Sequence, residues 1–137
     1  KNENMKEIKE KAEQMLQQCE VVTIASINEN GYPRPVPMSK IKSEGYSTVW
    51  MSTGNDSLKT NDFRLNPKAG LCYSDKSNSV ALTGEVEVIT DADIKKEFWQ
   101  DWFIEHFPLG PTDPNYVILK FKGQNATIWI DGVFIHD

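Results

Sequence analysis

Three prolines at alternate positions, Pro33, Pro35 and Pro37, limit how this chain can fold more than any other feature of its sequence. They lie in a predicted strand that begins at Tyr32. Because proline has no N–H group, such a strand can form a full hydrogen-bond ladder on one edge only. It is therefore either an edge strand protected against aggregation, or a strand whose second edge stays open for a ligand along the backbone of Arg34 to Met38.

Most of the predicted strands are joined by connections of hairpin length. One example is Asn28-Glu29-Asn30-Gly31, in which Asn30 and Gly31 are expected to supply the positive φ angles of a hairpin turn. Short connections indicate a mainly antiparallel sheet, closed or nearly closed into a small barrel within a single domain over residues 1–137. The predicted strands are Val21–Ile27, one from Tyr32, Ser47–Ser52, Ala69–Ser74, Ser79–Ile89, Tyr116–Lys122 and Ala126–Asp131; the predicted helices are Met5–Cys19, Ser57–Asn66 and Ala92–His106.

The stretch from Trp50 to Pro67 contains a strand, a turn with a glycine, and a short helix. Asp56 or Ser57 is placed to cap this helix, and Asn66 before a proline ends it. The first helical turn presents unpaired N–H groups and the positive end of the helix dipole, with Lys59 close by. This arrangement suits a phosphate monoester, and it equally describes a capped surface helix with a solvated lysine.

The charge balance argues against a nucleic-acid partner. The chain has 15 basic and 20 acidic side chains and a net charge of −5, whereas nucleic acid requires a clustered basic surface. No apolar run is long enough to span a membrane, and the first residues lack the apolar core of a secretory signal, so a cytoplasmic location is expected. A small anionic ligand fits the basic residues that gather in the first half of the chain, which are Arg34, Lys40, Lys42, Lys59, Arg64 and Lys68.

Six short motifs, in a fixed order and spacing, carry a resemblance to a known family. The motifs are Gly31-x-Pro33-Arg34-x-x-Pro37-Met38, Trp50-Met51-Ser52-Thr53, Ser57-Leu58-Lys59, Asn66-Pro67, Leu82-x-Gly84-x-Val86 and Pro114-x-Tyr116-x-Ile118. With these motifs the chain resembles the pyridoxamine 5'-phosphate oxidase-like family of FMN-binding split barrels, and more narrowly the branch related to general stress protein 26. The resemblance covers nearly the whole chain and implies an antiparallel split β-barrel of six to seven strands with about three helices packed outside.

The resemblance also implies an FMN site in a groove between two protomers. Arg34 and Lys59 can together neutralise a phosphate of about two negative charges. The family's oxidases proper continue with a C-terminal segment rich in Arg and His that holds pyridoxamine phosphate, whereas here His136 is alone near the end, so vitamin B6 oxidation is not expected. The implied FMN contacts are Arg34, Pro35, Val36, Pro37, Met38 and Ser39 on the second strand, Met51, Ser52 and Thr53 at the end of the third, and Ser57, Leu58 and Lys59 at the phosphate.

The predicted helix that starts at Ala92 carries more aromatic residues than one helix face can hold. We expect Phe98, Trp99, Trp102, Phe103 and Phe107 to form core and dimer interface. A tryptophan of this helix could also wall the flavin pocket, and Trp129 on the last strand is the other candidate wall. This apolar excess, together with a barrel too small to hold a flavin inside, predicts a homodimer with the cofactor at its interface.

The remaining polar residues offer no recognisable catalytic or metal-binding pattern. His106 and His136 have no partner at a known spacing, and no catalytic residue and no metal ligand are predicted. We expect Asp62 and Glu85 to be solvated, and the pair Lys95-Lys96 to lie on an exposed helix face. Cys19 and Cys72 form no metal or redox spacing and are expected to be small buried hydrophobic residues.

Two classes of function follow from the sequence. The first is an FMN-dependent oxidoreductase acting on a small molecule, in which the cofactor supplies the chemistry. The second is a non-enzymatic flavin carrier or sensor in a stress response, or a barrel that binds deazaflavin or haem instead. FMN is expected rather than FAD, because one phosphate cradle is visible and no second basic cluster or Gly-rich loop is present for an adenylate.

Overall fold

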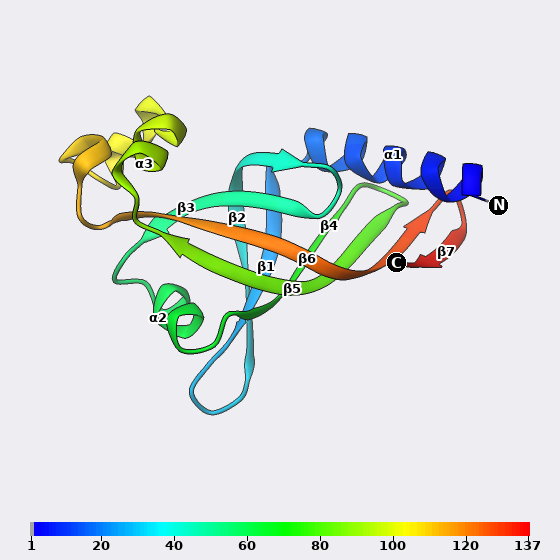
Figure 1. Ribbon diagram of the computed structural model, residues 1–137, viewed down its shortest axis with the longest axis horizontal. Helices are drawn as coiled ribbons and strands as arrows, with labels where there is room; N and C mark the ends of the chain where they lie inside the picture. Colours follow the sequence, from blue (N-terminus) through cyan, green and yellow to red (C-terminus); the bar gives the residue numbers. More distant parts are fainter. Residues whose placement is uncertain (1) are drawn as a thin grey trace.

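Six antiparallel strands close into a barrel in the computed structural model, which describes residues 2–137 (Figure 1). The elements are α1 Asn2–Gln18, β1 Val21–Ile27, β2 Pro33–Glu44, β3 Thr48–Gly54, α2 Leu58–Leu65, β4 Lys68–Ser74, β5 Ser79–Ile89, α3 Ala92–Phe98, the 3-10 helices η1 Asp101–Glu105 and η2 Gly110–Thr112, β6 Tyr116–Ile130 and β7 Val133–His136. The barrel order is β3-β2-β1-β4-β5-β6, and pairing of β3 with β6 closes the ring. The seventh strand, β7, pairs with β6. The predicted mainly β fold with an antiparallel barrel is confirmed.

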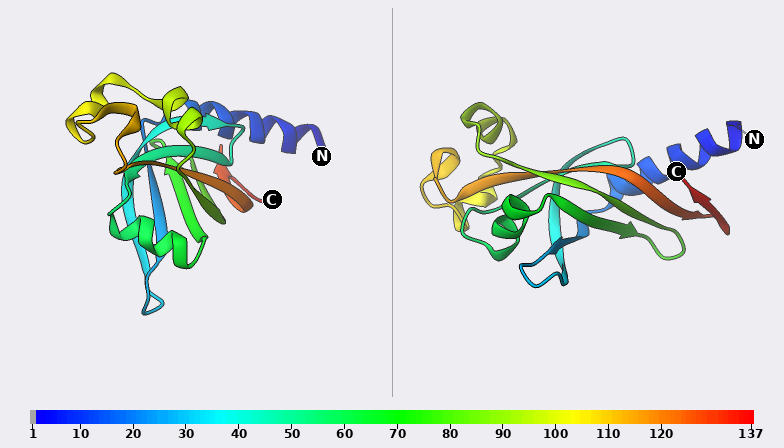
Figure 2. Two further views of the ribbon diagram at one scale, coloured as in Figure 1. Left: turned by 60° about the vertical axis from the view of Figure 1, so that its left-hand side comes forward. Right: turned by 60° about the horizontal axis from the view of Figure 1, so that its bottom comes forward.

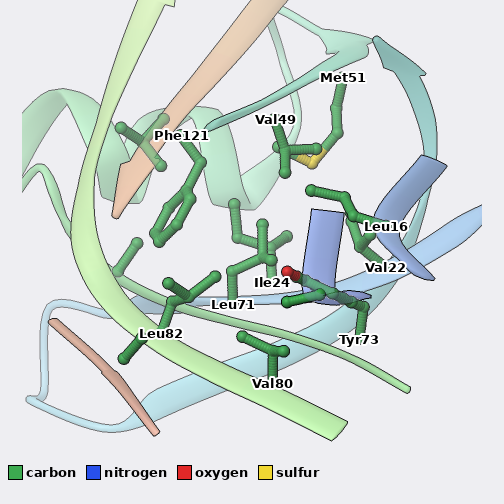
Figure 3. Close-up of a cluster of buried hydrophobic side chains, with 14 of the residues drawn as sticks. Leu16, Val22, Ile24, Val49, Met51, Leu71, Tyr73, Val80, Leu82 and Phe121 are labelled. Atoms are coloured by element: carbon green, nitrogen blue, oxygen red, sulfur yellow. The ribbon is translucent and has the colours of Figure 1, made fainter. Parts of the chain in front are cut away.

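Alternating side chains fill the barrel interior. Along β1, Val22, Ile24 and Ser26 are buried, whereas the residues between them are more exposed, as the two-residue period of a strand requires. Because the interior is occupied by side chains, a ligand must bind outside it. Figure 3 shows inward-pointing side chains of this core, with labels on Leu16, Val22, Ile24, Val49, Met51, Leu71, Tyr73, Val80, Leu82 and Phe121.

Two helices pack at opposite ends of the barrel (Figures 1 and 2). α1 contacts β2, β4 and β6 and inserts Ala12, Met15 and Leu16 into the core. α2 contacts β1 and β5 and inserts Phe63. β7 lies beside α1, so α2 and the C-terminal hairpin are at different ends of the molecule.

A second core lies outside the barrel, between β3, β6 and the segment 92–112, which we call the aromatic lobe. Trp50 and Tyr116 contribute the sheet side of this core. The Tyr116 ring centroid lies 5.3 Å from Trp99, 5.8 Å from Phe103 and 5.3 Å from Phe107. β3 and β6 are therefore covered on both faces, which explains why each contains consecutive buried residues.

The predicted helix Ala92–His106 is wrong beyond Phe98. Trp99 has a ψ angle of 136° and is extended, and a separate 3-10 helix follows. The break lets Phe98 pack on Trp50, with 5.9 Å between ring centroids, while Trp99 packs on Tyr116. Aromatic residues and aspartate are weak helix formers, so these tertiary contacts determine the local structure. The prediction of core packing is confirmed for Phe103, whereas Trp102 is 49% exposed.

The two predicted strands at the C-terminal end of the chain are one continuous strand, β6, and the predicted turn at residues 123–125 is wrong. At this point the register between β5 and β6 shifts by one residue, and the two backbones approach closely at Gly84. A Cβ atom at Gly84 would lie 2.1 Å from the Lys122 carbonyl oxygen. The true hairpin turn is Asp131-Gly132, where both residues have positive φ angles and β7 begins directly afterwards.

Other local predictions also require correction. In the β1–β2 turn only Gly31 has a positive φ angle, because the Asn28 side chain accepts hydrogen bonds from the N–H groups of Asn30 and Tyr32 and shapes the loop. Lys95 is buried rather than exposed: its ammonium group donates to the Asp113 carbonyl oxygen and lies over the Tyr116 ring. Cys72 is exposed, because it occupies an outward position of β4, and Cys19 is half-buried.

Candidate functional site

β2 and β3 separate along part of their length, and this split forms the candidate site (Figure 1). Residues Lys40–Glu44 of β2 pair with β3, with an irregularity next to Ile41. Residues Pro33–Ser39 pair with β1 only, because β3 turns away from them towards Gly54 and α2. One edge of this segment is therefore unpaired within residues 2–137.

The prolines lie on the unpaired edge. Lys40 donates its N–H to the Glu20 carbonyl, and the Tyr32 carbonyl accepts from the Asn28 N–H. Bonding direction alternates along an antiparallel strand, so the even-numbered residues face β1 and the odd-numbered residues face the open edge. The carbonyl groups of Pro33, Pro35 and Pro37 therefore point towards the open edge. Because the N–H positions of these residues also face that edge, their lack of an N–H group costs no hydrogen bond with β1. The prediction of a strand that pairs on one edge only is confirmed.

α2 begins beside the split, and Ser57 is its N-cap. The Ser57 hydroxyl accepts from the Thr60 N–H at 3.3 Å, and the Thr60 hydroxyl donates to the Gly54 carbonyl at 2.7 Å. Ser57 rather than Asp56 is therefore the capping residue. The N–H groups of Leu58 and Lys59 have no acceptor within residues 2–137, so they remain available at the positive end of the helix.

Arg34 and Lys59 both lie near the start of α2: Arg34 lines a hollow together with Leu58, and Lys59 is in the first helical turn. The pKa of Lys59 lies below its ordinary value, because burial disfavours the charged ammonium group and the nearby Arg34 guanidinium repels it. Among residues 2–137, no carboxylate lies within ion-pair distance of Lys59. Two cations and two free N–H groups thus converge beside the open edge of β2.

The expectation that Asp62 is solvated is wrong. Asp62 is buried on α2, where its Oδ2 accepts a hydrogen bond from Ser26 Oγ at 2.7 Å and pairs with Arg34 Nη1 at 3.2 Å. The partners lie on β1 and β2, 36 and 28 residues away in sequence, so no local pattern could have indicated them. Glu85, by contrast, is exposed as expected.

The other sequence-predicted contacts divide by the direction in which their side chains point. Met51 is fully buried in the barrel core, and the half-buried Val36 and Met38 pack against the same core, so these residues can meet a ligand only through their backbone. Thr53 is buried, with its hydroxyl 3.5 Å from Ser57 Oγ, and Leu58 is 69% exposed. The exposed or half-exposed members of the set are Pro35, Pro37, Ser39 and Ser52.

Trp129 is not brought to the split in the same chain. It lies near the end of β6, where its ring packs on Phe134 at a centroid distance of 4.3 Å. This is the end of the molecule covered by α1 and β7, opposite α2 (Figure 1). In residues 2–137 no group of three His, Cys, Asp or Glu side chains is arranged to hold a metal ion.

A surface of mostly uncharged side chains adjoins the open edge, and Lys68 and Glu85 lie at one end of it. We call its uncharged part the outer sheet face; it carries outward-pointing residues of β1, β2, β4 and β5. A hollow of about 420 Å³ lies within it, lined in part by Ala25, Pro33 and Gly70. The members of this face are Val21, Thr23, Ala25, Ile27, Pro33, Pro35, Pro37, Ser39, Gly70, Cys72, Ala81 and Thr83.

The fold and site define the class of protein: a closed antiparallel barrel with one split, and a cationic helix N-terminus beside that split. The chain belongs to the pyridoxamine 5'-phosphate oxidase family, whose model matches residues 8–130. This confirms the resemblance found in the sequence motifs. No curated protein sequence matches the chain.

Several solved structures share the fold. A protein from Clostridium acetobutylicum related to general stress protein 26 of B. subtilis has a TM-score of 0.84 and 24% identity, over 96% of this chain and 94% of that chain. General stress protein 26 from Bacillus anthracis has a TM-score of 0.77 and 23% identity, over 95% and 98%. The general stress FMN/FAD binding protein from Xanthomonas citri has a TM-score of 0.76 and 23% identity, over 95% and 93%.

None of the helices formed by residues 2–137 is both long enough and apolar enough to cross a bilayer.

Proposed function

We propose that this protein binds FMN at the split between β2 and β3, in a homodimer, and serves as a flavin-dependent oxidoreductase of a small molecule. The observation that carries the proposal is the presence of two positive side chains, Arg34 and Lys59, beside two free N–H groups at the start of α2. Family membership and the FMN/FAD binding protein of the same fold support a flavin as the ligand.

The phosphate end of the site fits a single monoester. Arg34 and Lys59 supply two positive charges against the roughly two negative charges of a phosphate at neutral pH. The N–H groups of Leu58 and Lys59 add donors that point along the helix axis. The Ser57 hydroxyl accepts from the Thr60 N–H and lies 2.8 Å from the Thr60 hydroxyl, whose proton goes to the Gly54 carbonyl, so Ser57 serves this end of the site as the helix cap. One such cradle favours FMN over FAD, which would present a pyrophosphate and an adenosine.

The ring end of the site fits the open edge of β2. The outward carbonyls of Pro33, Pro35 and Pro37 accept hydrogen bonds, and Ser39 is the first residue along this edge that also carries an N–H group. Met51, Ser52 and Thr53 border the other side of the split through the backbone of β3. A flat ring bound here would be exposed on one side unless a second surface covered it.

The outer sheet face supports a homodimer as that cover. Its members carry no charge, and the centres of protein interfaces are depleted of charged residues. The open edge of β2 borders this face, so a second copy placed on the face also covers the split. Trp129 lies far from the split within its own chain, and it can wall the flavin only from the second protomer. The aromatic lobe contributes less than the sequence indicates, because most of its rings pack within the chain.

A bound flavin would supply hydride and electron transfer, and the residues of this chain would bind it, orient it and exclude water. None of the proposed contacts needs to exchange a proton, so the absence of an acid–base pair in the motif is compatible with this role. A non-enzymatic flavin carrier or sensor would use the same contacts.

Identification of the ligand tests the proposal. The purified protein is heated, and the released ligand is separated against FMN, FAD and riboflavin standards, with FMN added to ligand-free protein as a second route. We expect FMN to dominate. Release of FAD alone, or no uptake of any flavin, would contradict the proposal. Reduction of the bound flavin by NADH or NADPH, followed by turnover with an electron acceptor, then distinguishes an oxidoreductase from a carrier.

A further inference from the structure

The buried carboxylate of Asp62 links three elements behind the candidate site. It lies on α2, accepts from Ser26 on β1 at 2.7 Å and pairs with Arg34 on β2 at 3.2 Å. Ser26 and Asp62 are buried, whereas the Arg34 side chain is 37% exposed. One side of the guanidinium is thus held by the protein. The rest borders a hollow of about 220 Å³ between the β1–β2 hairpin and the start of α2.

Stability alone does not account for this ion pair. Removing a carboxylate and a guanidinium from water costs about as much as their attraction returns, so a buried pair is weak support for a fold. Its geometric effect is larger, because Arg34 has a long flexible side chain and a planar group whose donors must be aimed to be useful. The Ser26 hydroxyl fixes Asp62, and Asp62 in turn fixes Arg34.

The nearby Lys59 ammonium gives such a hold a further role. Lys59 and Arg34 repel each other across the start of α2. Without a neighbouring anion, the flexible Arg34 side chain would swing into solvent and increase its distance from Lys59. Asp62 offsets this repulsion from the side that faces the protein interior.

We propose that Asp62 is a positioning residue, which holds the Arg34 guanidinium beside the N-terminus of α2 with its free donors directed at the phosphate of the flavin. This inference rests on the proposed function. Asp62 does not touch the ligand and acts through Arg34. The opposite role, an anion that competes with the phosphate for Arg34, predicts the reverse effect on affinity.

The first test examines Arg34 directly, in protein without ligand. The chain contains two arginines, Arg34 and the exposed Arg64, so nitrogen-15 NMR of labelled arginine side chains includes its own control. We expect separate, slowly exchanging Nη signals for Arg34 in the wild type. In Asp62→Asn, which preserves shape and removes the charge, we expect the averaged signals of a freely rotating group. Arg34 signals that match those of Arg64 in the wild type would overturn the proposal.

The second test compares FMN with riboflavin, which lacks only the phosphate. We expect Asp62→Asn to weaken FMN binding about tenfold, the scale seen when a group that orients a ligand contact is removed, and to leave riboflavin affinity unchanged. In an Arg34→Ala background the same change should add no further loss. Glu85→Gln, which removes an exposed carboxylate, is the matched control.

The other outcomes overturn the inference in distinct ways. Tighter FMN binding by Asp62→Asn would identify Asp62 as a competing anion. Equal losses for FMN and riboflavin, with a lower thermal midpoint, would identify a purely structural residue. A wild-type protein that takes up neither FMN nor riboflavin would overturn the proposed function, while the NMR signals of the ligand-free protein still decide whether Asp62 orders Arg34.

Discussion

At the scale of single residues, Lys59 places a partly buried ammonium group beside the Arg34 guanidinium. Burial and this repulsion both disfavour its charged form, so Lys59 opposes the stability of the ligand-free protein. For Lys59→Met we expect the free energy of unfolding without ligand to rise by less than about 1 kcal/mol, because solvent screens much of the repulsion. FMN affinity should fall by about 1.5–3 kcal/mol, the usual contribution of a charge-assisted hydrogen bond. Urea denaturation and fluorescence titration measure the two effects.

The pH dependence of this stability difference follows from the sign of the pKa shift. The folded-state pKa of Lys59 is lower than its ordinary value of 10.5, so the destabilisation is complete at pH values below the folded-state pKa. It should disappear as the pH rises from the folded-state pKa to the ordinary value. Lys76→Met, a change at an exposed lysine in the β4–β5 turn, should alter neither stability nor affinity. Unchanged FMN affinity in Lys59→Met would show that Lys59 is only a surface charge.

Local chemistry explains which site residues the sequence could indicate. Ser57 and Lys59 lie within one helical turn, and their roles follow from the capping pattern and the following proline. Asp62 and Lys95 were expected to be solvated, because an acidic or basic residue on a short helix is usually exposed. Their partners come from other elements, and only the folded chain brings Ser26 to Asp62 or Asp113 to Lys95.

At the scale of elements, the backbones of the paired strands β5 and β6 approach closely at Gly84. A Cβ atom there would lie 2.1 Å from the Lys122 carbonyl oxygen and 2.8 Å from the Gly123 Cα, and both are backbone atoms that cannot rotate away. We expect Gly84→Ala to lower the free energy of unfolding by at least about 2 kcal/mol, because the two strands must separate. Gly70→Ala is the control: its Cβ would lie 3.7 Å from the Leu82 carbonyl oxygen, an ordinary contact. Equal urea midpoints for the two variants would contradict this account of the close approach between β5 and β6.

The β5–β6 pair also shows where helices and strands can be predicted from sequence and where they cannot. A run of residues that favour strands predicts β1, and alternation within the segment supports β5; both are properties of the segment itself. Gly123 and Asn125 are typical of a turn and predict two strands, whereas β6 is continuous and only its register with β5 shifts there. The helix from Ala92 was extended past Trp99 for a similar reason, since its break depends on Tyr116, a residue distant in sequence.

At the scale of the whole molecule, the outer sheet face and the split form one continuous region. Its members along β1 and β2 are uncharged, and the open edge of Pro33–Ser39 forms its border. A two-fold pairing through this region would use the same surface on both copies and create two equivalent sites. A stable pairing should bury more than about 1,000 Å² in total.

Ala25→Arg tests whether this face joins two chains. Ala25 lies at the middle of β1, between Pro35 on β2 and Gly70 on β4, and its side chain points away from the barrel core. An arginine there leaves the core intact and places a long charged side chain at the centre of the proposed interface, which opposes association. By light scattering at micromolar concentration, we expect the wild type to have twice the 15.6 kDa chain mass and Ala25→Arg to have the mass of one chain. The monomeric Ala25→Arg variant should also bind FMN more weakly, because each flavin loses the surface that covers it.

Glu10→Arg is the control for this prediction. It introduces the same side chain on the exposed side of α1 and should remain dimeric. A wild-type monomer with FMN still bound would show that one chain builds the whole site, and the outer sheet face would then need another explanation.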